Sequence, residues 1–414
     1  MNNLKMLDLC TGIGGFHVAA KRNGLIETIA TSEIDPFNVK FIERNLNLPN
    51  AGDASLIAIP RAEHPHQELV DQDLVPVEET GFTSLCIEDF YEGVLDFPNI
   101  VSAGFPCQDV TPANTLGNHQ GINGKKSGLI HSILDTVESL EPEYAVFENS
   151  ANLPKRGLDY ILGELNRMGY IVEWETIAAC NFGFPHYRSR CYIVAYLPTT
   201  AIARGNRRVF DLARKRANKQ PNAVCPLPAE NPELIKELAV VKNPRSIKLR
   251  TKRINALGNA IIPEIALAIF DAITNAEFAE TKTKSVKARM SESYMASRLT
   301  DGWGKAQLDM FSQTDKEIVT DMPSRGIVIN GELYTGAPDR RLNPTKTTYK
   351  GLLSTIIAKD GNNNFTSGSR MSRPGKLGGL IGDIQRLGAD EGGLNPAFGQ
   401  LIMGYEQGYT ELAY

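Results

Sequence analysis

The stretch KMLDLCTGIGGF, residues 5–16, decides the fold. Its apolar first half is typical of a buried strand, and Gly12, Gly14 and Gly15 follow where such a strand would turn into a helix. Glycines at this kind of turn let the backbone approach a ligand closely. A nicotinamide fingerprint, G-x-G-x-x-G, would need glycine at position 17, which is His17. The cluster is therefore compatible with a nucleotide-like cofactor but does not identify one.

The rest of the first 200 residues alternates between strand and helix signals. Apolar residues recur at helical spacing in 129–140 and 158–168. Such alternation favours an α/β fold, with a mostly parallel sheet flanked by helices. The last two strand candidates lie so close together that we expect an antiparallel pair at one edge of the sheet. The strand candidates are residues 5–9, 27–32, 100–104, 144–147, 171–178 and 191–196.

Length and composition exclude several classes of protein. The 414 residues are too many for one ordinary domain, and 42% hydrophobic with 22% charged residues is a globular composition. Six scattered cysteines without a C-x-x-C pair indicate a reducing compartment, and neither a disulfide framework nor a metal site. With no signal peptide and no apolar run of membrane-spanning length, we expect a cytoplasmic protein without a membrane partner.

Charge is distributed unevenly, although the formal net charge of −4 gives no global sign of a polyanion partner. Residues 62–124 hold no Lys or Arg, and we interpret about 50–83 as an inserted acidic loop. Residues 200–256 hold 14 Lys and Arg against four acids, which suits phosphate binding; a solvated helix face is the competing interpretation. Residues 276–290 have the composition of a linker, and a hairpin is expected beyond it at Asn330-Gly331.

Chemically active side chains collect where the predicted strands end. Glu33 follows the second strand in TSEIDPF (31–37), where an acid commonly holds ribose hydroxyls. GFPCQD (104–109), FENS (147–150) and GFPHYRSRCYIVA (183–195) each adjoin a strand. In a parallel sheet these ends meet at one edge, where ligands bind. A thiol at this edge would lie in a ligand-binding site, whereas most cysteines are buried in a hydrophobic core.

Together with the glycine cluster, these motifs resemble the DNA (cytosine-5) methyltransferase family. Its hallmarks are a Gly-rich first motif, a Pro-Cys nucleophile, a Glu-Asn pair and a Gln-x-Arg-x-Arg element. GKKSGL (124–129) and LGNAIIP (257–263) are also similar to motifs of that family, and all six follow in family order over 1–273. The resemblance implies a Rossmann-like, mostly parallel seven-stranded sheet that binds S-adenosylmethionine, with a second, smaller mixed or β-rich domain.

The resemblance also implies catalytic roles. Cytosine C5 is a poor nucleophile, and a thiolate that adds at C6 converts the ring to an enamine whose C5 can attack an electrophilic methyl group. By the resemblance, that thiolate belongs to Cys107. Glu148 would stabilise the ring at N3, and Arg190, with Arg188 as a further candidate, would donate to O2.

S-adenosyl-L-methionine is the implied methyl donor, and no metal is expected. The resemblance assigns the glycines to its amino-acid part and Glu33 to its ribose. Asp89 would bind the adenine amino group, and Asn259 would help to close the pocket. The complete set of candidate cofactor-binding residues is Asp8, Gly12, Gly14, Gly15, Phe16, Glu33, Asp89, Phe90, Pro106 and Asn259.

The chain also departs from the family pattern. Cys10 stands where phenylalanine is common, and His186 replaces the glutamine of the arginine motif. The recognition region of the family usually precedes the Gly-Asn motif, whereas here about 140 residues follow that motif. Among them, LIMGYEQGY (401–409) is similar to a scaffold motif of the family, although Glu406 stands where that motif has proline. We therefore expect a catalytic and cofactor-binding domain at 1–275 and a target-recognition domain at 291–414, so that deleting 285–414 leaves cofactor binding intact.

The expected substrate is a cytosine of double-stranded DNA, flipped out because a stacked base cannot present its ring to a thiol. We expect a monomer, with a cognate restriction endonuclease as a further candidate partner. Two alternatives stay open: an RNA (cytosine-5) methyltransferase of the same family, and a cofactor-dependent DNA-binding protein without turnover. A nicotinamide dehydrogenase is disfavoured by the glycine spacing.

Overall fold

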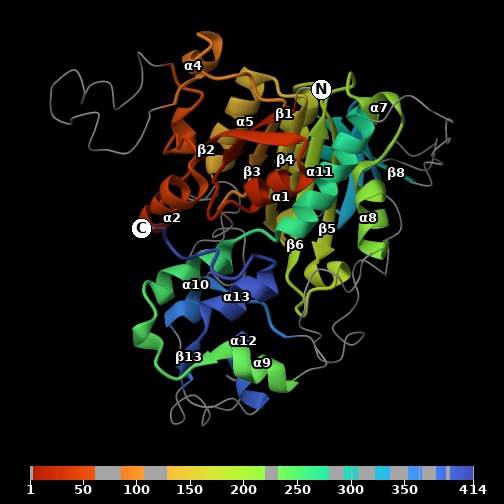
Figure 1. Ribbon diagram of the computed structural model, residues 1–414. Helices are drawn as coiled ribbons and strands as arrows, with labels where there is room; N and C mark the ends of the chain where they lie inside the picture. Colours follow the sequence, from red (N-terminus) through yellow and green to blue (C-terminus); the bar gives the residue numbers. More distant parts are fainter. Residues whose placement is uncertain are drawn as a thin grey trace.

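The structure, a computed structural model, describes residues 3–60, 85–106, 128–219, 232–278, 293–299, 302–305, 322–335, 353–362, 364–365, 379–387 and 392–413. Within these residues, a large body built on a ten-stranded sheet lies above a smaller, mainly helical body (Figure 1). Cys107, most of GKKSGL, most of the acidic insert and most of the predicted linker lie outside the described residues.

Four parallel strands form the N-terminal half of the large sheet, in the order β2-β1-β3-β4. Their bounds are Leu4–Leu9 for β1, Ile26–Ser32 for β2, Ile100–Ala103 for β3 and Tyr144–Ser150 for β4. Every residue of β3 and β4 is buried, as expected for central strands covered on both faces. Because the strands are parallel, the segments that follow them meet at one edge of the sheet.

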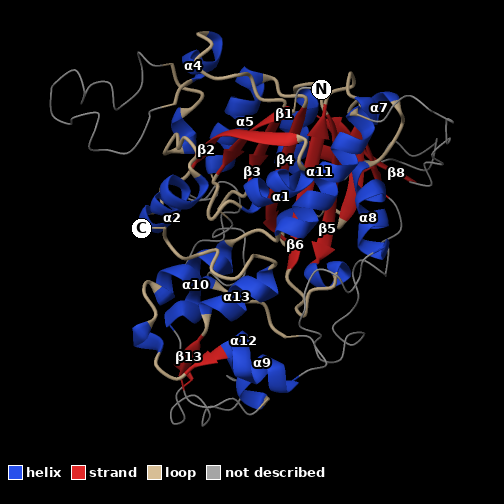
Figure 2. Cartoon of the chain, viewed as in Figure 1, coloured by secondary structure: helices blue, strands red, loops and turns tan. Residues whose placement is uncertain are grey.

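The two faces of the sheet carry separate cores. Neighbouring residues of a strand point to opposite sides, so Val146 packs into one core and Phe147 into the other. Figure 2 shows helices in front of the strands and behind them, which confirms the α/β class. The Val146 face is covered by α1 (Gly15–Asn23), α8 (Val209–Lys219) and α11 (Pro263–Glu277), and the Phe147 face by α5 (Leu129–Leu140) and α6 (Leu158–Arg167).

The antiparallel pair predicted from the sequence is confirmed as β5 (Ile171–Ala178) and β6 (Ser189–Tyr196), with β6 also paired to β4. Its expected place at the edge is wrong, because β10 (Arg325–Ile329) pairs with the outer side of β5. A bare strand edge leaves backbone groups unpaired, and β10 satisfies them. The described sheet has ten strands and not seven, since it continues through β11 (Glu332–Thr335), β8 (Ser293–Leu299) and β9 (Gly302–Lys305).

The hairpin between β10 and β11 turns at Asn330-Gly331, as predicted. Both residues have left-handed backbone, with φ of 50° and 79°, which suits a two-residue type I′ turn. Gly326 lies so close to the Trp174 ring on β5 that a Cβ would collide with the indole. Trp174 Nε1 also donates to the Pro323 carbonyl at 2.9 Å, so one indole fixes the hairpin to the sheet.

The smaller body combines two distant parts of the chain and contains its own sheet, β12-β13-β7. The division at 276–290 therefore does not separate two consecutive structural units. Residues 293–299, 302–305 and 325–335 extend the large sheet, while 232–259 join the smaller body. The elements of this body are α9 (Pro232–Ala239), β7 (Val240–Val241), α10 (Arg250–Asn259), β12 (Asn364–Phe365), α12 (Gly379–Arg386), β13 (Gly392–Leu394) and α13 (Pro396–Met403).

Short helices connect these elements. Their bounds are Pro36–Phe41 for α2, Ile42–Leu46 for the π-helix η1, Ala54–Leu56 for η2, Ile87–Tyr91 for α4, Leu153–Lys155 for η5, Ala179–Phe182 for η6, Ala201–Arg204 for α7, Pro244–Ser246 for η7 and Ala358–Asn362 for η8. In the described part of the chain, no single helix has the length and hydropathy to cross a membrane; the bent pair α10–α11 meets that test by length and composition alone.

Candidate active site

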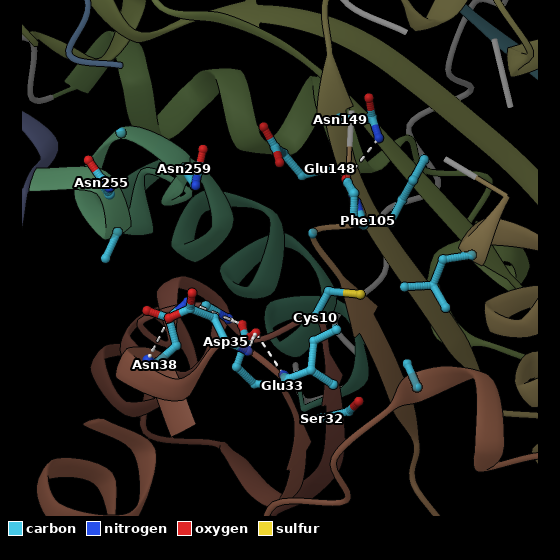
Figure 3. Close-up of a pocket in the computed structure, with 18 of the residues that line it drawn as sticks. Cys10, Ser32, Glu33, Asp35, Asn38, Phe105, Glu148, Asn149, Asn255 and Asn259 are labelled. Carbon is cyan, nitrogen blue, oxygen red and sulfur yellow. Dashed lines mark hydrogen bonds between the residues drawn. The ribbon is translucent and has the colours of Figure 1, made fainter. Parts of the chain in front are cut away.

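A cavity of about 400 Å³, which we call the central cavity, lies at the carboxyl ends of β1 to β4. Figure 3 shows Glu33, Asp35 and Asn38 on one of its walls and Glu148 with Asn149 on another. This edge is where α/β proteins bind their ligands. Seven of the candidate catalytic and cofactor-binding residues line it: Gly12, Glu33, Pro106, Glu148, Arg188, Arg190 and Asn259.

The three glycines after β1 have different surroundings. Gly12 has a left-handed backbone, with φ of 59°, and a Cβ placed on it would meet nothing within 4 Å. Gly15 is packed tightly, since a Cβ there would lie 2.8 Å from Ile261 Cβ and 3.0 Å from the Tyr405 hydroxyl. Gly14 is similarly close to Leu46. Gly12 therefore lines the central cavity, whereas Gly14 and Gly15 allow α1 to pack against its neighbours.

Glu33, just beyond β2, turns its carboxylate toward backbone N–H groups. Oε2 accepts from Gly12 at 2.7 Å, and Oε1 accepts from Ile34 and Asp35 at 2.8 Å each. Burial raises the pKa of Glu33, and these three N–H groups act against that rise. Asn50 holds the residue in place, because its side chain accepts from the Glu33 N–H at 2.9 Å and donates to the Glu33 carbonyl at 3.1 Å.

Glu148 and Arg190 come together across the β4–β6 pair. Their side chains form an ion pair of 3.0 Å between Glu148 Oε1 and Arg190 Nε, with 9% and 24% of the side-chain surfaces exposed. Burial raises the pKa of Glu148, while the guanidinium groups of Arg190 and Arg188 lower it. The cavity thus holds a buried carboxyl group whose neutral form is favoured by burial, beside a guanidinium group that can donate to a ligand.

Arg188 lines the same cavity but donates to protein groups. Its two terminal nitrogens contact the carbonyls of Gly258, Ala260 and Ile356 at 3.1, 2.7 and 3.2 Å, and Thr355 Oγ1 at 3.3 Å. Burial, followed by the Arg190 charge, lowers the Arg188 pKa to about 9. Arg188 therefore ties β6 to the smaller body, which leaves Arg190 as the arginine better placed to bind a substrate.

His186, at the position of the family's glutamine, also connects the segment before β6 to another part of the chain. Its Nε2 lies 2.7 Å from the Ile402 carbonyl of α13, and the ring is fully buried. Burial is the main cause that lowers its pKa to about 3, so the imidazole is neutral. This contact joins the strand that carries Arg190 to the C-terminal segment.

The loop after β3 is held beside the cavity. Asn149 Nδ2 donates to the Phe105 carbonyl at 3.0 Å (Figure 3), and this contact holds the loop against the end of β4. Pro106 lines the central cavity. The described segment 85–106 ends at Pro106, and the next residue in the sequence is Cys107, the expected nucleophile.

Asp8 and Phe16, two further candidates, do not line the central cavity. Asp8 is buried and accepts from Ser102 Oγ at 2.7 Å, and burial is the main cause that raises its pKa to about 7. Phe16 is buried in the core, where its ring lies 6.0 Å from that of Phe270. Both residues therefore pack against neighbouring elements, and neither is among the residues that line the central cavity.

Asp89 and Phe90 likewise lie outside the central cavity. The Asp89 carboxylate accepts from the Cys86 N–H at 2.8 Å and so caps α4. Phe90 is buried among apolar neighbours. The structure therefore gives no support to contact between Asp89 and an adenine.

Sequence reasoning missed several residues that line the central cavity: Ser32, Ile34, Asp35, Asn38, Asp53, Lys252 and Asn255. Two signals point to them. Asp35-Pro36 is a helix start, and the Asp35 carboxylate accepts from the N–H groups of Phe37 and Asn38. Asp53 lies three residues after Asn50, whose backbone forms an isolated parallel bridge with Thr31 of β2.

The C-terminal segment contacts the elements around the glycine turn. Tyr405 donates to the Ile261 carbonyl at 2.8 Å, and Tyr409 donates to the Ile13 carbonyl of the glycine turn at 2.7 Å. The two rings are 4.8 Å apart, and Tyr409 also packs on Phe41 at 5.1 Å. The loosely matching motif LIMGYEQGY thus supports the glycine turn, a role that its sequence did not reveal.

The model for C-5 cytosine-specific DNA methylases matches residues 83–346. The chain belongs to this family. Type II methyltransferase M.Sau3AI of Staphylococcus aureus is 28% identical over 205 residues, covering 47% of this chain and 44% of that protein. M.MspI of Moraxella sp is 27% identical over 201 residues, covering 47% and 39%. The matched region spans less than half the length of these relatives.

Among solved structures, the Dnmt2 methyltransferase of S. pombe is similar at 21% identity and a TM-score of 0.34, over 47% of this chain and 51% of that chain. The family implies S-adenosyl-L-methionine as methyl donor, and the described residues fit it. Gly12 faces open space beside Glu33, and Ile34 is 63% exposed at the cavity. The cavity volume lies within the range of small-molecule sites. Among the described residues, no group of three or more His, Cys, Asp or Glu could hold a metal ion.

Proposed function

We propose that the protein is an S-adenosyl-L-methionine-dependent methyltransferase that acts on C5 of cytosine in DNA. The observation that carries this proposal is the buried Glu148–Arg190 pair, which shares one cavity with Gly12 and Glu33. One wall suits a nucleoside-type cofactor, and the other suits the polar edge of a pyrimidine. Family membership supports the same conclusion.

We assign the nucleophile to Cys107, which follows the cavity-lining Pro106. Its thiolate adds to C6 of a flipped-out cytosine. The π electrons of the C5=C6 double bond shift to C4–C5, and those of C4=N3 move onto N3. C5 of the resulting enamine takes the methyl group that the bound donor supplies. The C5 proton then leaves to a base, the Cys107–C6 bond breaks, and the aromatic ring and the free thiolate are restored.

Glu148 and Arg190 stabilise the charge that this addition creates. A neutral Glu148 carboxyl donates to N3, and burial favours that neutral form. Arg190 donates to O2 of the same ring. Arg188 has its terminal nitrogens on backbone carbonyls and Thr355, so we assign it to positioning.

On the cofactor side, we assign Gly12 to backbone contact, Glu33 to the ribose hydroxyls and Asn259 to closure of the pocket. For the adenine amino group we assign Asp53, because it lines the central cavity and Asp89 does not. We propose that the smaller body and the segments around it recognise the target sequence, the role expected for 291–414. The monomeric state and the cognate restriction endonuclease stay predictions.

Two experiments test the proposal. Labelled S-adenosyl-L-methionine incubated with duplex DNA or with RNA identifies the substrate, and bisulfite sequencing of DNA from expressing cells identifies the methylated sites. Label incorporated only into RNA, or into neither, contradicts the proposal.

The covalent step has its own prediction. Cys107→Ser abolishes methylation and leaves binding of S-adenosylhomocysteine nearly unchanged, because the thiolate acts on the base and not on the cofactor. DNA with 5-fluorocytosine at the target traps the wild-type protein through residue 107, since fluorine cannot leave as the C5 proton does. Normal turnover by Cys107→Ser, measured by label transfer, would refute the assignment.

A further inference from the structure

The Lys- and Arg-rich segment 200–256 does not act as one surface, because several of its arginines bind protein groups. Their partners are a carboxylate, a carbonyl or a hydroxyl of the same chain, so these guanidinium groups hold elements together. The pairs are Arg208–Glu173, Arg214–Glu175, Arg250–Leu394 and Arg253–Thr410. A phosphate site must therefore be sought where cations from different parts of the chain gather in space, and not along this segment as a whole.

A second cavity, of about 780 Å³, gathers cations from distant parts of the chain; we call it the basic cavity. Figure 1 shows α2 close to the C-terminus and above α10, and these three regions form its walls. Exposed cations line it from both sides: Lys40 and Arg44 from α2 and η1, and Lys248 and Lys252 from the start of α10. Among its described lining residues the single acid, Glu411, pairs with Arg253 at 3.2 Å.

The lining suits a sugar–phosphate chain better than a free ion. Cations that share a cavity repel one another, and a bound anion relieves that repulsion. Between the charges, the wall includes Phe37, Ile247, Leu249 and Leu412, which offer apolar surface to sugar carbons. A phosphodiester backbone presents charge and apolar carbon in alternation, and binding it releases condensed counterions.

Lys248 lies just before α10 and Lys252 lies in its first turn, and a protein contact anchors the backbone between them. Leu249 has a left-handed backbone, with φ of 53°, and is 49% exposed at the entrance to α10. The neighbouring Arg250 is buried, and its Nε donates to the Leu394 carbonyl at 2.9 Å. The Arg250 contact thus anchors the backbone between Lys248 and Lys252, and both lysines line the same wall of the basic cavity.

We propose that the basic cavity binds the phosphate backbone of the DNA whose cytosine is methylated. This inference rests on the proposed function. Lys252 lines both the basic cavity and the central cavity, so a strand held in the one lies next to the other. Inorganic phosphate shares the anion chemistry, and it is distinguished from DNA below.

The test compares two double variants with a matched control. Lys40→Gln with Arg44→Gln, and separately Lys248→Gln with Lys252→Gln, remove two charges from opposite walls. Lys21→Gln with Arg204→Gln removes two exposed charges that line neither cavity. Affinity for a fluorescent duplex is measured from 0.05 to 0.5 M salt. Each cavity variant lowers the slope of log K against log salt by about 2 and weakens binding roughly ten- to a hundredfold at 0.1 M salt, while the control keeps the wild-type slope.

Lysine acetylation of the wild-type chain provides a second readout. A duplex protects Lys40, Lys248 and Lys252 from acetylation, and inorganic phosphate at the same phosphate concentration does not. Wild-type slopes in both cavity variants, or protection by inorganic phosphate alone, overturn this inference while methylation of DNA by the wild-type chain still supports the proposed function. A wild-type chain that neither binds nor methylates duplex DNA overturns both.

Discussion

At the scale of single residues, burial decides how Glu148 behaves. The carboxyl group lies at the end of a fully buried strand, and desolvation raises its pKa more than the two arginines lower it. A neutral carboxyl can donate to a ring nitrogen, whereas an ionised one cannot. The activity should therefore depend on keeping Glu148 protonated.

Replacing Glu148 with Gln should lower kcat about 10²- to 10⁴-fold, because the amide cannot deliver a proton to N3 as its negative charge builds. In the wild-type chain, kcat falls as the pH rises through the raised Glu148 pKa, and this descending limb is absent from the variant. The pH profile of label transfer checks both expectations. Glu164→Gln, on the surface of α6 beside Arg167, is the matched control and keeps the wild-type profile. An unchanged kcat in Glu148→Gln would exclude a role for this carboxyl.

At the scale of elements, close packing holds the added hairpin on the sheet. Gly326 has room for no Cβ because the Trp174 ring occupies that space, while Gly331 needs only its left-handed backbone. Glycine is therefore required at 326 by packing against Trp174, and at 331 by the backbone geometry of the turn. A sequence pattern shows both as glycines and cannot tell these causes apart.

Gly326→Ala should cost about 1–3 kcal/mol of unfolding free energy, because the added methyl group forces the hairpin away from β5. Gly331→Ala should cost about 1 kcal/mol through backbone strain alone. Urea unfolding measures both, and tryptophan fluorescence shifts only in Gly326→Ala because its site adjoins Trp174. Equal spectra for the two variants would argue against the packing explanation.

The same scale applies to the tyrosines behind the glycine turn. Tyr405→Phe and Tyr409→Phe each leave a backbone carbonyl without its donor, which should cost about 1 kcal/mol of stability. Because those carbonyls belong to Ile261 and Ile13, we expect binding of S-adenosylhomocysteine to weaken several-fold. Calorimetric titration measures this effect. Tyr170→Phe, whose hydroxyl donates to the Pro142 carbonyl away from the cavity, loses comparable stability but keeps the affinity.

At the scale of the whole molecule, the large sheet and the central cavity both depend on C-terminal residues. β10 covers the edge of β5, His186 contacts the Ile402 carbonyl, and Tyr409 contacts the glycine turn. A chain cut before 285 loses all three contacts. The structure thus gives a physical reason to reverse the sequence-based expectation for this deletion.

Deleting 285–414 should abolish binding of S-adenosylhomocysteine. It should also expose the β5 edge, so the truncated chain should aggregate. Calorimetric titration and sedimentation of the truncated chain, beside the full chain, check this outcome. A soluble truncated chain that binds the cofactor product with full affinity would instead restore the expectation drawn from the sequence.

The sequence by itself determined the α/β class, the β5–β6 pairing, the turn at Asn330-Gly331 and the strand-end motifs that carry Glu33, Glu148 and Arg190. These follow from local patterns, since periodicity and turn chemistry act over a few residues. Tertiary structure alone decided that 325–335 extend the sheet, that Asp53 and not Asp89 lines the central cavity, and that 232–259 pack with the C-terminal segment. Such choices depend on which surfaces fit together across hundreds of residues, and packing of this kind leaves no periodic trace in the chain.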